Sequence, residues 1–246
     1  MRIQYAANYR SNSGLAVIDL SIAIQHTPHC ADRRKWTQAM IEQLRREDPD
    51  IPLALIKDTR LEGCWPTYRR ALRAASNASH HLVLQDDLGL CGDFIRSVKE
   101  VIRARPKNLI ALYTNSRSVL EARARGEAWI EKDGVTGPAV IWPKELIGEF
   151  LRWQDTYINP DFLYDTVRVS MWLIKTSKRA FATVPSLTEH LGCMSSTLGL
   201  NSPSKVATWF IGEDRSALDI DWSRGVCSPV KDVSNVRQEW WEHLRE

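Results

Sequence analysis

The stretch HHLVLQDD, residues 80–87, decides the fold expected for this chain. Its apolar run is too short for a convincing helix and predicts a buried strand. The strand ends abruptly at Asp86 and Asp87, and Gly89 follows at once. Because an ionised Asp is costly to bury, such a strand should deliver both carboxylates to a solvent-facing edge. Ligands of open α/β sheets bind at that carboxyl edge, so the stretch predicts a site as well as a strand.

The two adjacent carboxylates offer hard oxygen ligands. Such ligands suit Mg²⁺ or Mn²⁺ bridging to a phosphate. The alternative is a solvated turn in which Asp86 and Asp87 cap backbone groups, a common use of Asp. The buried strand that precedes them favours the ligand interpretation.

Strands and helices alternate around this stretch. Apolar spacing predicts strands at 18–25, 53–57 and 109–113, and helices at 32–47, from Pro66 and from Asp93, with Asp32 as the cap of the first helix. Three β-α units imply parallel strands, right-handed crossovers and helices on both faces. The chain has neither G-x-G-x-x-G nor G-x-x-x-x-G-K-[ST], so a phosphate ligand needs a metal or basic side chains.

The second half of the chain is less regular. We expect a turn-rich loop at 134–138, a strand at 139–142, helices at 143–151 and 161–175, and a strand at 181–184. One domain over residues 1–246 is the simplest organisation. It would carry an N-terminal extension at 1–15 and a Trp-rich amphipathic C-terminal tail at 235–246.

Composition narrows the class of protein. With 43% hydrophobic and 26% charged residues, the 246-residue chain has an ordinary globular composition, and its net charge of +3 does not demand a nucleic-acid partner. The five Cys are scattered, with no Cys-x-x-Cys pair, which argues against a disulfide framework or a zinc knuckle and fits a cytoplasmic location. No apolar stretch approaches the length of a membrane span. Ten Trp suit a core as well as a sugar or base site.

Four segments together resemble one known family. They are residues 64–72 (CWPTYRRAL), 84–88 (LQDDL), 134–143 (GVTGPAVIWP) and 185–192 (PSLTEHLG). In this order they are similar to the GT-A fold glycosyltransferases, which transfer a sugar from a nucleotide donor. The closest resemblance is to lipopolysaccharide-type members that carry Glu-Asp-Asp in place of Asp-X-Asp. The resemblance covers residues 18–210 and implies a single GT-A-like (Rossmann-like) α/β domain, with a mainly parallel central sheet flanked by helices.

The resemblance implies a metal site. Asp87 and His190 would bind Mn²⁺ or Mg²⁺, which neutralises a diphosphate leaving group. Asp86 would contact the metal through water or hold the donor ribose. Gln85 departs from the family's acidic residue: its amide can still bond a ribose hydroxyl, but it lowers the local charge. For His190 the alternative is a structural histidine without a ligand role.

The resemblance also implies contacts to a nucleotide-sugar donor, with a UDP-sugar favoured. The nucleotide base and phosphates would lie just past the first strand. The base or ribose would form a hydrogen bond at the end of the second strand, and the glycine loop would lie near the phosphates. The corresponding residues are His26, Thr27, Arg33, Asp58 and Gly137, and His29 lies beside them. A loop or capping role is the alternative for each.

An inverting transfer needs a general base on the acceptor hydroxyl, usually a carboxylate. In the family this residue opens the helix before the Pro-Ser-Leu segment and a Trp follows. Asp165, with Trp172 seven residues later, fits that place best. Asp161 and Asp155 compete, because the family's acidic pair is missing. Alternatively, Asp165 only complements the dipole of its helix.

A locally basic stretch, Arg103–Arg125, is the candidate acceptor contact. Its cations face only Glu121 and are Arg103, Arg105, Lys107, Arg117, Arg123 and Arg125. A basic stripe suits a polyanion such as DNA or a phosphorylated glycan lipid, although a solvated helix face is the alternative. Small phage GT-A enzymes that glycosylate hydroxymethylated DNA bases would fit. The base would be flipped out and could stack on Trp129 or Trp142.

The resulting hypothesis is a metal-dependent glycosyltransferase that moves a sugar from a nucleotide-diphosphate sugar to an acceptor hydroxyl with inversion. The acceptor would be a hydroxymethylated base in DNA, a glycan or a lipid-linked glycan. Gln85 keeps open a catalytically weak nucleotide-sugar binder. A nucleic-acid-binding protein without transferase activity is the third class, and it would bind DNA in a salt-dependent way regardless of metal.

Overall fold

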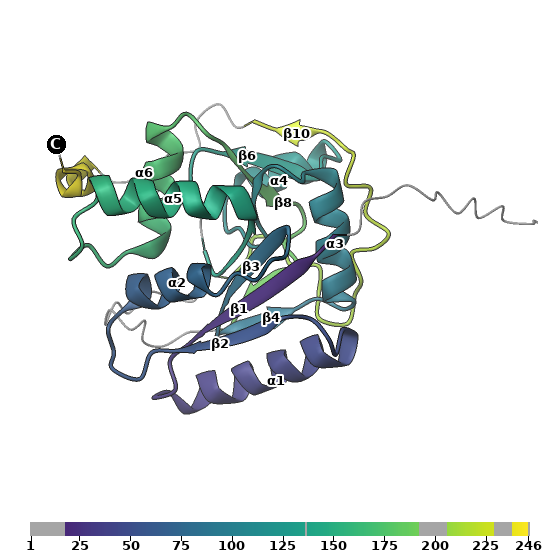
Figure 1. Cartoon of the computed structure of the whole chain (residues 1–246). Coiled ribbons are helices and arrows are strands. Elements are labelled where there is room, and N and C mark those ends of the chain that lie inside the picture. Colours follow the sequence, from purple (N-terminus) through teal and green to yellow (C-terminus); the bar gives the residue numbers. More distant parts are fainter. Residues whose placement is uncertain (1–17, 136, 192–205, 229–237, 246) are drawn as a thin grey trace, which may run out of the picture.

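A computed structural model of the chain describes residues 18–135, 137–191, 206–228 and 238–245 (Figure 1). One sheet contains β1 (Leu20–His26), β2 (Leu53–Lys57), β3 (His80–Gln85), β5 (Leu109–Ala111), β6 (Trp129–Lys132), β7 (Ala139–Pro143), β8 (Ala180–Thr183) and β10 (Val226–Cys227). The helices are α1 (Ala31–Glu47), α2 (Cys64–Arg73), α3 (Phe94–Ala104), α4 (Ser118–Ala124), α5 (Lys144–Tyr157) and α6 (Asp165–Lys175). The predicted α/β class is confirmed.

The strand directions set the edge at which a site can form. The eight strands follow the order β10-β6-β8-β5-β7-β3-β1-β2. β1 pairs in parallel with β2 and β3, whereas β7 pairs antiparallel with both β3 and β5. β5 therefore runs in the same direction as β3, and the carboxyl ends of these four strands meet at one edge. The parallel arrangement predicted for them is confirmed, but the sequence did not indicate that β7 lies between β3 and β5.

β3 is buried on both faces, which explains its uninterrupted apolar run. Leu82 and Leu84 pack in the layer of α1 and α3. Val83 points to the opposite face and packs with α2, α5 and α6. Figure 1 shows these two groups of helices on opposite sides of the sheet. β3 therefore has no solvated face, and polar side chains can appear only where the strand ends.

Several helix boundaries differ from the prediction; the helix expected at 143–151, for example, continues to Tyr157. The helix expected at 161–175 begins at Asp165, because the buried Arg168 side chain holds the preceding segment in an irregular conformation. Arg168 donates from Nε to the carbonyl oxygen of Phe162 at 2.8 Å and from Nη2 to that of Asn159 at 2.8 Å. The first helix begins at Ala31, so Asp32 lies inside its first turn and is not its cap.

Several short elements were not predicted. A second, two-stranded sheet pairs β4 (Leu88–Leu90) with β9 (Thr188–His190), and β6 and the edge strand β10 were also missed. Within the predicted C-terminal tail, the 3₁₀ helix η1 (Gln238–His243) packs Trp240 and Trp241 on the cluster around Phe162. No helix in the described parts of the chain combines the length and apolar character needed to cross a bilayer.

Candidate functional site

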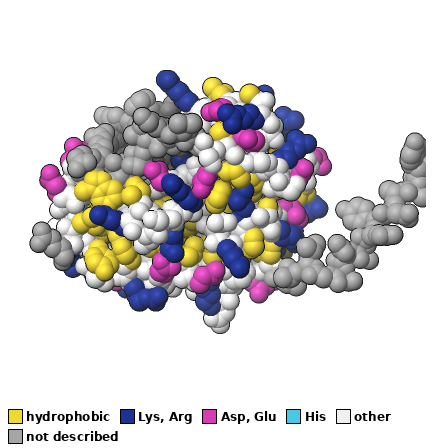
Figure 2. Space-filling model, turned by 90° about the horizontal axis from the view of Figure 1, so that it is seen from above, with side chains coloured by type: hydrophobic (Ala, Val, Ile, Leu, Met, Phe, Trp, Pro, Cys, Tyr) yellow, Lys and Arg dark blue, Asp and Glu magenta, His cyan; other side chains and the backbone are white. Residues whose placement is uncertain are grey.

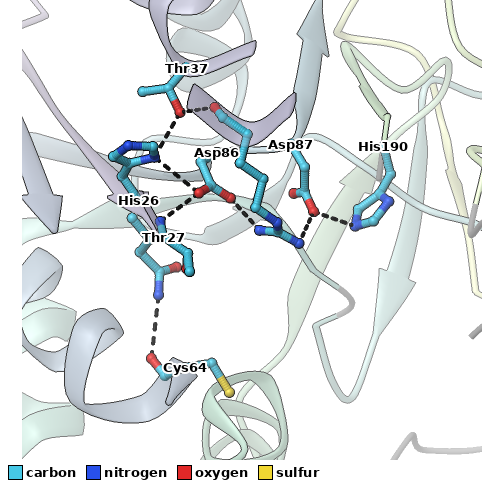
Figure 3. Close-up of polar contacts among 9 residues, drawn as sticks. His26, Thr27, Thr37, Cys64, Asp86, Asp87 and His190 are labelled. Carbon is cyan, nitrogen blue, oxygen red and sulfur yellow. Dashed lines mark hydrogen bonds and ion pairs between the residues drawn. The ribbon is translucent and has the colours of Figure 1, made fainter. Parts of the chain in front are cut away.

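Asp86 and Asp87 follow β3 directly, at the carboxyl edge of the sheet. The sequence led us to expect both at a solvent-facing edge, and this is wrong: their relative exposures are 2% and 1%. Buried carboxylates need charge and hydrogen-bond partners, and the ends of β1 and α1 supply them. Figure 3 shows the resulting cluster.

Asp86 is held on three sides. Its Oδ2 atom accepts a hydrogen bond from the backbone N–H of Thr27 at 2.6 Å and lies 3.1 Å from Nδ1 of His26. Its Oδ1 atom pairs with Nη1 of Arg33. Thr37 completes the support, because its Oγ1 lies 3.0 Å from the same His26 nitrogen. These contacts anchor the end of β3 to the loop after β1.

Asp87 is only partly satisfied by the described residues. Its Oδ2 atom lies 2.6 Å from Nη2 of Arg33 and 3.4 Å from Nε2 of His190 (Figure 3). Its Oδ1 atom is buried and has no hydrogen-bond partner among the described residues, and the same holds for Nδ1 of His190. A buried polar atom without a partner calls for an explanation, and a ligand that binds there is one. Asp87 and His190 are therefore the open part of the cluster.

His190 reaches this place through the small second sheet. β4 and β9 pair antiparallel, with Leu88 opposite His190 and Leu90 opposite Thr188. The backbone N–H of Leu191 also donates to the carbonyl oxygen of Asp87 at 2.7 Å. The structure thus brings together Asp87 and His190, the pair for which the family resemblance implied a metal-ligand role.

The electrostatics of the cluster follow from burial and pairing. Burial raises the pKa of Asp87 above its usual range, although Arg33 and His190 favour its charged form. Burial disfavours the charged Arg33 guanidinium, but Asp87 and Asp86 outweigh this effect and raise its pKa. The guanidinium therefore stays charged between the two carboxylates.

The donor atoms of Asp87 and His190 fit a divalent cation. A carboxylate oxygen and an imidazole nitrogen suit Mn²⁺, and magnesium-type sites commonly complete their coordination with substrate phosphates. No group of three or more His, Cys, Asp or Glu that could hold a metal occurs among the described residues. Asp86, committed to Arg33, His26 and Thr27, is not part of the open pair. The protein thus offers two ligands, and a phosphate would have to supply others.

The glycine loop lies beside the cluster. The backbone N–H of Gln85 donates to the carbonyl oxygen of Pro138 at 2.7 Å. Gly137 has φ +112, and a Cβ atom placed there would approach Cδ1 of Tyr113 to 3.2 Å. The Tyr113 ring in turn lies 6.3 Å from that of His190 between centroids. Tyr113 therefore links the loop to the open pair, and the donor contact predicted at Gly137 stays a prediction.

Asp165 lies at the same edge but in a neighbouring environment. It opens α6, is 5% exposed, and its Oδ2 atom has no partner among the described residues. Burial raises its pKa to about 6, partly offset by the backbone N–H of Thr166 and by the Gln25 side chain. Gln25 pairs with Gln85 across β1 and β3. Asp165 is thus connected to the edge that carries Asp86 and Asp87.

The competing carboxylates are placed differently. Asp155 is 44% exposed on α5 and pairs with Arg69 at 2.7 Å. Asp161 is exposed in the loop before α6. Neither has the burial that perturbs Asp165, so Asp165 is the buried carboxyl of the three.

Two other predicted donor contacts have local structural roles. Asp58 is 2% exposed and accepts backbone hydrogen bonds from Glu62 at 2.9 Å and Gly63 at 3.2 Å. It shapes the loop that leads into α2, which is the capping alternative. His29 lies 3.2 Å from the carbonyl oxygen of Thr59 through Nε2. A nucleotide contact for either residue stays a prediction.

The prediction that a flipped-out base stacks on Trp129 or Trp142 is wrong. Trp129 and Trp142 are both fully buried in the core. Trp142 donates to the Tyr68 hydroxyl at 2.9 Å, and Trp129 donates to the carbonyl oxygen of Trp222 at 2.9 Å. Their apolar packing and satisfied N–H groups leave no ring face for a base.

The basic stretch does not form one stripe. Residues 103–107 precede β5 at the amino edge of the sheet, whereas residues 117–125 follow it at the carboxyl edge. Several of its cations also have partners: Arg103 pairs with Glu100 and Arg125 with Glu121, while Arg105 and Arg123 stack over aromatic rings. On the face seen in Figure 2, Lys and Arg are interspersed with Asp and Glu. A strand running between its two halves is the physical reason for the division.

Sequence reasoning missed two supporting residues. Thr37 lies four residues after Arg33, so both occupy one face of α1, and this spacing is the signal that could have found it. Gln25 donates to the carbonyl oxygen of Cys64 at 3.4 Å and lies beside Asp165. Its contact with a residue 140 positions away depends on α6 packing next to α2, and nothing local in the sequence indicates it.

Comparison of the sequence with protein families and with curated proteins finds no match. Solved structures with a similar arrangement include the S. aureus TarS fragment 1–349 alone and with UDP, each with a TM-score of 0.44. The same fragment with UDP-GlcNAc has a TM-score of 0.42. All three are 11% identical and cover 69% of this chain, which spans 56–58% of their length.

Proposed function

We propose that this protein is a glycosyltransferase that uses a nucleotide-diphosphate sugar, with a UDP-sugar favoured, and a divalent cation. One observation carries the proposal: Asp87 and His190 meet at the carboxyl edge of the sheet, with a buried carboxylate oxygen that has no partner among the described residues. That edge is where α/β sheets bind nucleotides. Mn²⁺ bound there would neutralise the charge that develops on a diphosphate leaving group.

The residues around the open pair have separate tasks in this proposal. Asp86 is the anchor: through Thr27 and His26 it sets the position of Asp87. Gln85, at the end of β3, is half-buried and available to a ribose hydroxyl. Gly137 lets the loop approach the donor phosphates without a side chain. Arg33 is the fixed cation closest to the carboxylates.

Asp165 is the proposed general base for inversion. It would accept the proton of the acceptor hydroxyl as that oxygen attacks the anomeric carbon and the nucleoside diphosphate leaves with the bonding electrons. A pKa of about 6 leaves this buried carboxyl mostly ionised at pH 7 and close to the value at which bases work efficiently.

For the acceptor we propose a hydroxyl on a polyanion, with hydroxymethylated DNA as the first substrate to test. The exposed Arg117, Arg123 and Arg125 follow β5 at the carboxyl edge of the sheet, the edge that also carries the carboxylates. Tyr113, just before this segment, lies near His190. Transfer to a neutral glycan but not to DNA would assign the acceptor to the glycan class instead.

Thermal shift and calorimetry with a panel of UDP- and GDP-sugars, each with and without Mn²⁺, test the donor. We expect a metal-dependent shift with one donor, since ligand binding raises apparent stability. Release of the nucleoside diphosphate in the presence of hydroxymethylated DNA then tests transfer. Asp87→Asn and His190→Gln should both abolish the metal-dependent part of donor binding.

Asp50→Asn is the matched control, because it removes the same charge from an exposed turn outside the site. It should bind the donor as the wild-type protein does. No shift with any donor would contradict the proposal. Donor binding without release of nucleotide would instead identify a nucleotide-sugar binder.

A further inference from the structure

Arg33 occupies the space between the two carboxylates of the site. It projects from the first turns of α1 and is 15% exposed. One arm of its guanidinium pairs with Asp86, and the other lies 2.6 Å from Oδ2 of Asp87. That Asp87 oxygen is also the one 3.4 Å from Nε2 of His190. A fixed positive charge therefore adjoins the two side chains that would bind a cation.

This arrangement opposes each ligand when it binds alone. A divalent cation at Asp87 and His190 would meet the positive guanidinium beside it, in a buried place where charges are poorly screened. A diphosphate alone would meet two carboxylates and a single guanidinium, and like charges repel it. When both bind, phosphate oxygens can complete the coordination of the metal and can also accept hydrogen bonds from Arg33.

We propose that Arg33 couples the two ligands, so that the metal binds firmly only together with the nucleotide diphosphate. The inference rests on the proposed function and deepens it, since it names the residue because of which the metal binds tightly only together with the donor. Arg33 is then more than a phosphate contact: its charge lowers metal affinity until the diphosphate arrives. Such coupling is reciprocal, so the metal must raise nucleotide affinity by the same factor.

The test measures Mn²⁺ binding by calorimetry or by electron paramagnetic resonance, first without nucleotide and then with saturating UDP. In the wild-type protein we expect UDP to tighten Mn²⁺ binding at least about tenfold, within the usual range of coupling between sites. In Arg33→Gln we expect Mn²⁺ alone to bind about tenfold more tightly than in the wild type. The effect of UDP on that affinity should shrink accordingly.

Two further variants separate the effect of the lost charge from an effect of damage to the fold. Arg33→Lys keeps the positive charge but loses the planar fork, so its Mn²⁺ affinity without nucleotide should stay near that of the wild type. Arg46→Gln removes the same charge from an exposed position on the same helix and should change neither affinity. Thermal melting of each variant establishes that it is folded.

The outcomes are distinct from those that test transfer. Unchanged or weaker Mn²⁺ binding in Arg33→Gln overturns the inference. So does Mn²⁺ binding without nucleotide that tightens as much in Arg33→Lys as in Arg33→Gln. If Arg33→Gln does not fold, the wild-type measurement decides: no change in Mn²⁺ affinity on adding UDP contradicts the coupling. A protein that couples Mn²⁺ and UDP but transfers no sugar would contradict the proposed transfer and support the role of Arg33.

Discussion

Asp87 and His190 lie side by side because β4 and β9 pair antiparallel, with Leu88 directly opposite His190. Asp86, one residue earlier, faces the opposite way, toward Thr27 and His26 (Figure 3). Two adjacent carboxylates thus have different surroundings. One is saturated by protein groups, and the other keeps a buried oxygen without a partner among the described residues.

This difference predicts unequal losses of stability for the two substitutions to asparagine. Asp86→Asn should destabilise the protein by about 1.5–3 kcal/mol, because it weakens hydrogen bonds made to a charged group. Asp87→Asn should cost less, since burial already disfavours the charge of Asp87. Urea unfolding of both variants measures the difference. Equal destabilisation would contradict the assignment of Asp86 as the anchor.

Asp165 should make stability depend on pH. Its pKa rises from 3.8 to about 6 on folding, so the folded state favours the protonated carboxyl. This contribution to stability is present below about pH 4 and is lost as pH rises through 6, amounting to about 2–3 kcal/mol. Asp165→Asn should therefore be more stable than the wild type at pH 7.5, and this advantage should vanish near pH 4.

The same variant should lose transfer activity if Asp165 is the general base. Asp155→Asn is the control, because Asp155 is exposed and paired with Arg69. It should keep both its transfer activity and the pH dependence of the wild type. Near-normal transfer by Asp165→Asn would exclude Asp165 as the base.

His81 should contribute acid sensitivity. Its ring lies 2.8 Å from the Ser21 hydroxyl and 2.9 Å from the carbonyl oxygen of Ala71, and burial lowers its pKa from 6.5 to about 4. Because the folded state disfavours the charged ring, stability is present above pH 6.5 and is lost as pH falls through 4, by up to about 3 kcal/mol. In His81→Gln, the free energy of unfolding measured by chemical denaturation should depend less on pH over this range. His29→Gln, a substitution at an exposed position, is the control and should leave the pH dependence of stability as it is in the wild type.

Gly137→Ala should damage the glycine loop. With φ +112 and Tyr113 at 3.2 Å from an added Cβ, an alanine there is strained in both backbone and packing, at a cost of about 1–3 kcal/mol. Donor affinity should fall along with stability. Gly126→Ala is the matched control: its φ is +67 but open space surrounds it, so donor affinity should not change. A normal donor affinity in Gly137→Ala would remove the loop from the donor site.

Much of the first half of the fold was predictable. The strands near 18–25, 53–57 and 80–87 and the helices between them carry continuous apolar runs or apolar residues at helical spacing, which are local signals. The position of β7 between β3 and β5 has no such signal, because an apolar strand pairs equally well with several neighbours. The short strands β4 and β9 were missed for the same reason, since they are stabilised mainly by each other and by the core that they complete.

The candidate site was predictable in its residues and not in its arrangement. Asp86, Asp87 and Arg33 were identified from the sequence, and they do form one cluster. The sequence could not show that Arg33 bridges both carboxylates, because this depends on how α1 packs against the end of β3. Nor could it show that Trp129 and Trp142 are buried, since a tryptophan in the core and one in a binding site look alike in a sequence.

By itself, the sequence determined that a buried strand ends in two carboxylates at the carboxyl edge of an α/β sheet. Burial of the apolar run and the shared direction of the parallel strands are enough to dictate that. Only the tertiary structure decided which carboxylate is open and what faces it. Strand pairing brings His190 to Asp87, and helix packing places the charge of Arg33 between Asp86 and Asp87. These contacts join residues that are far apart in the chain, so they form and stabilise the site only in the folded protein.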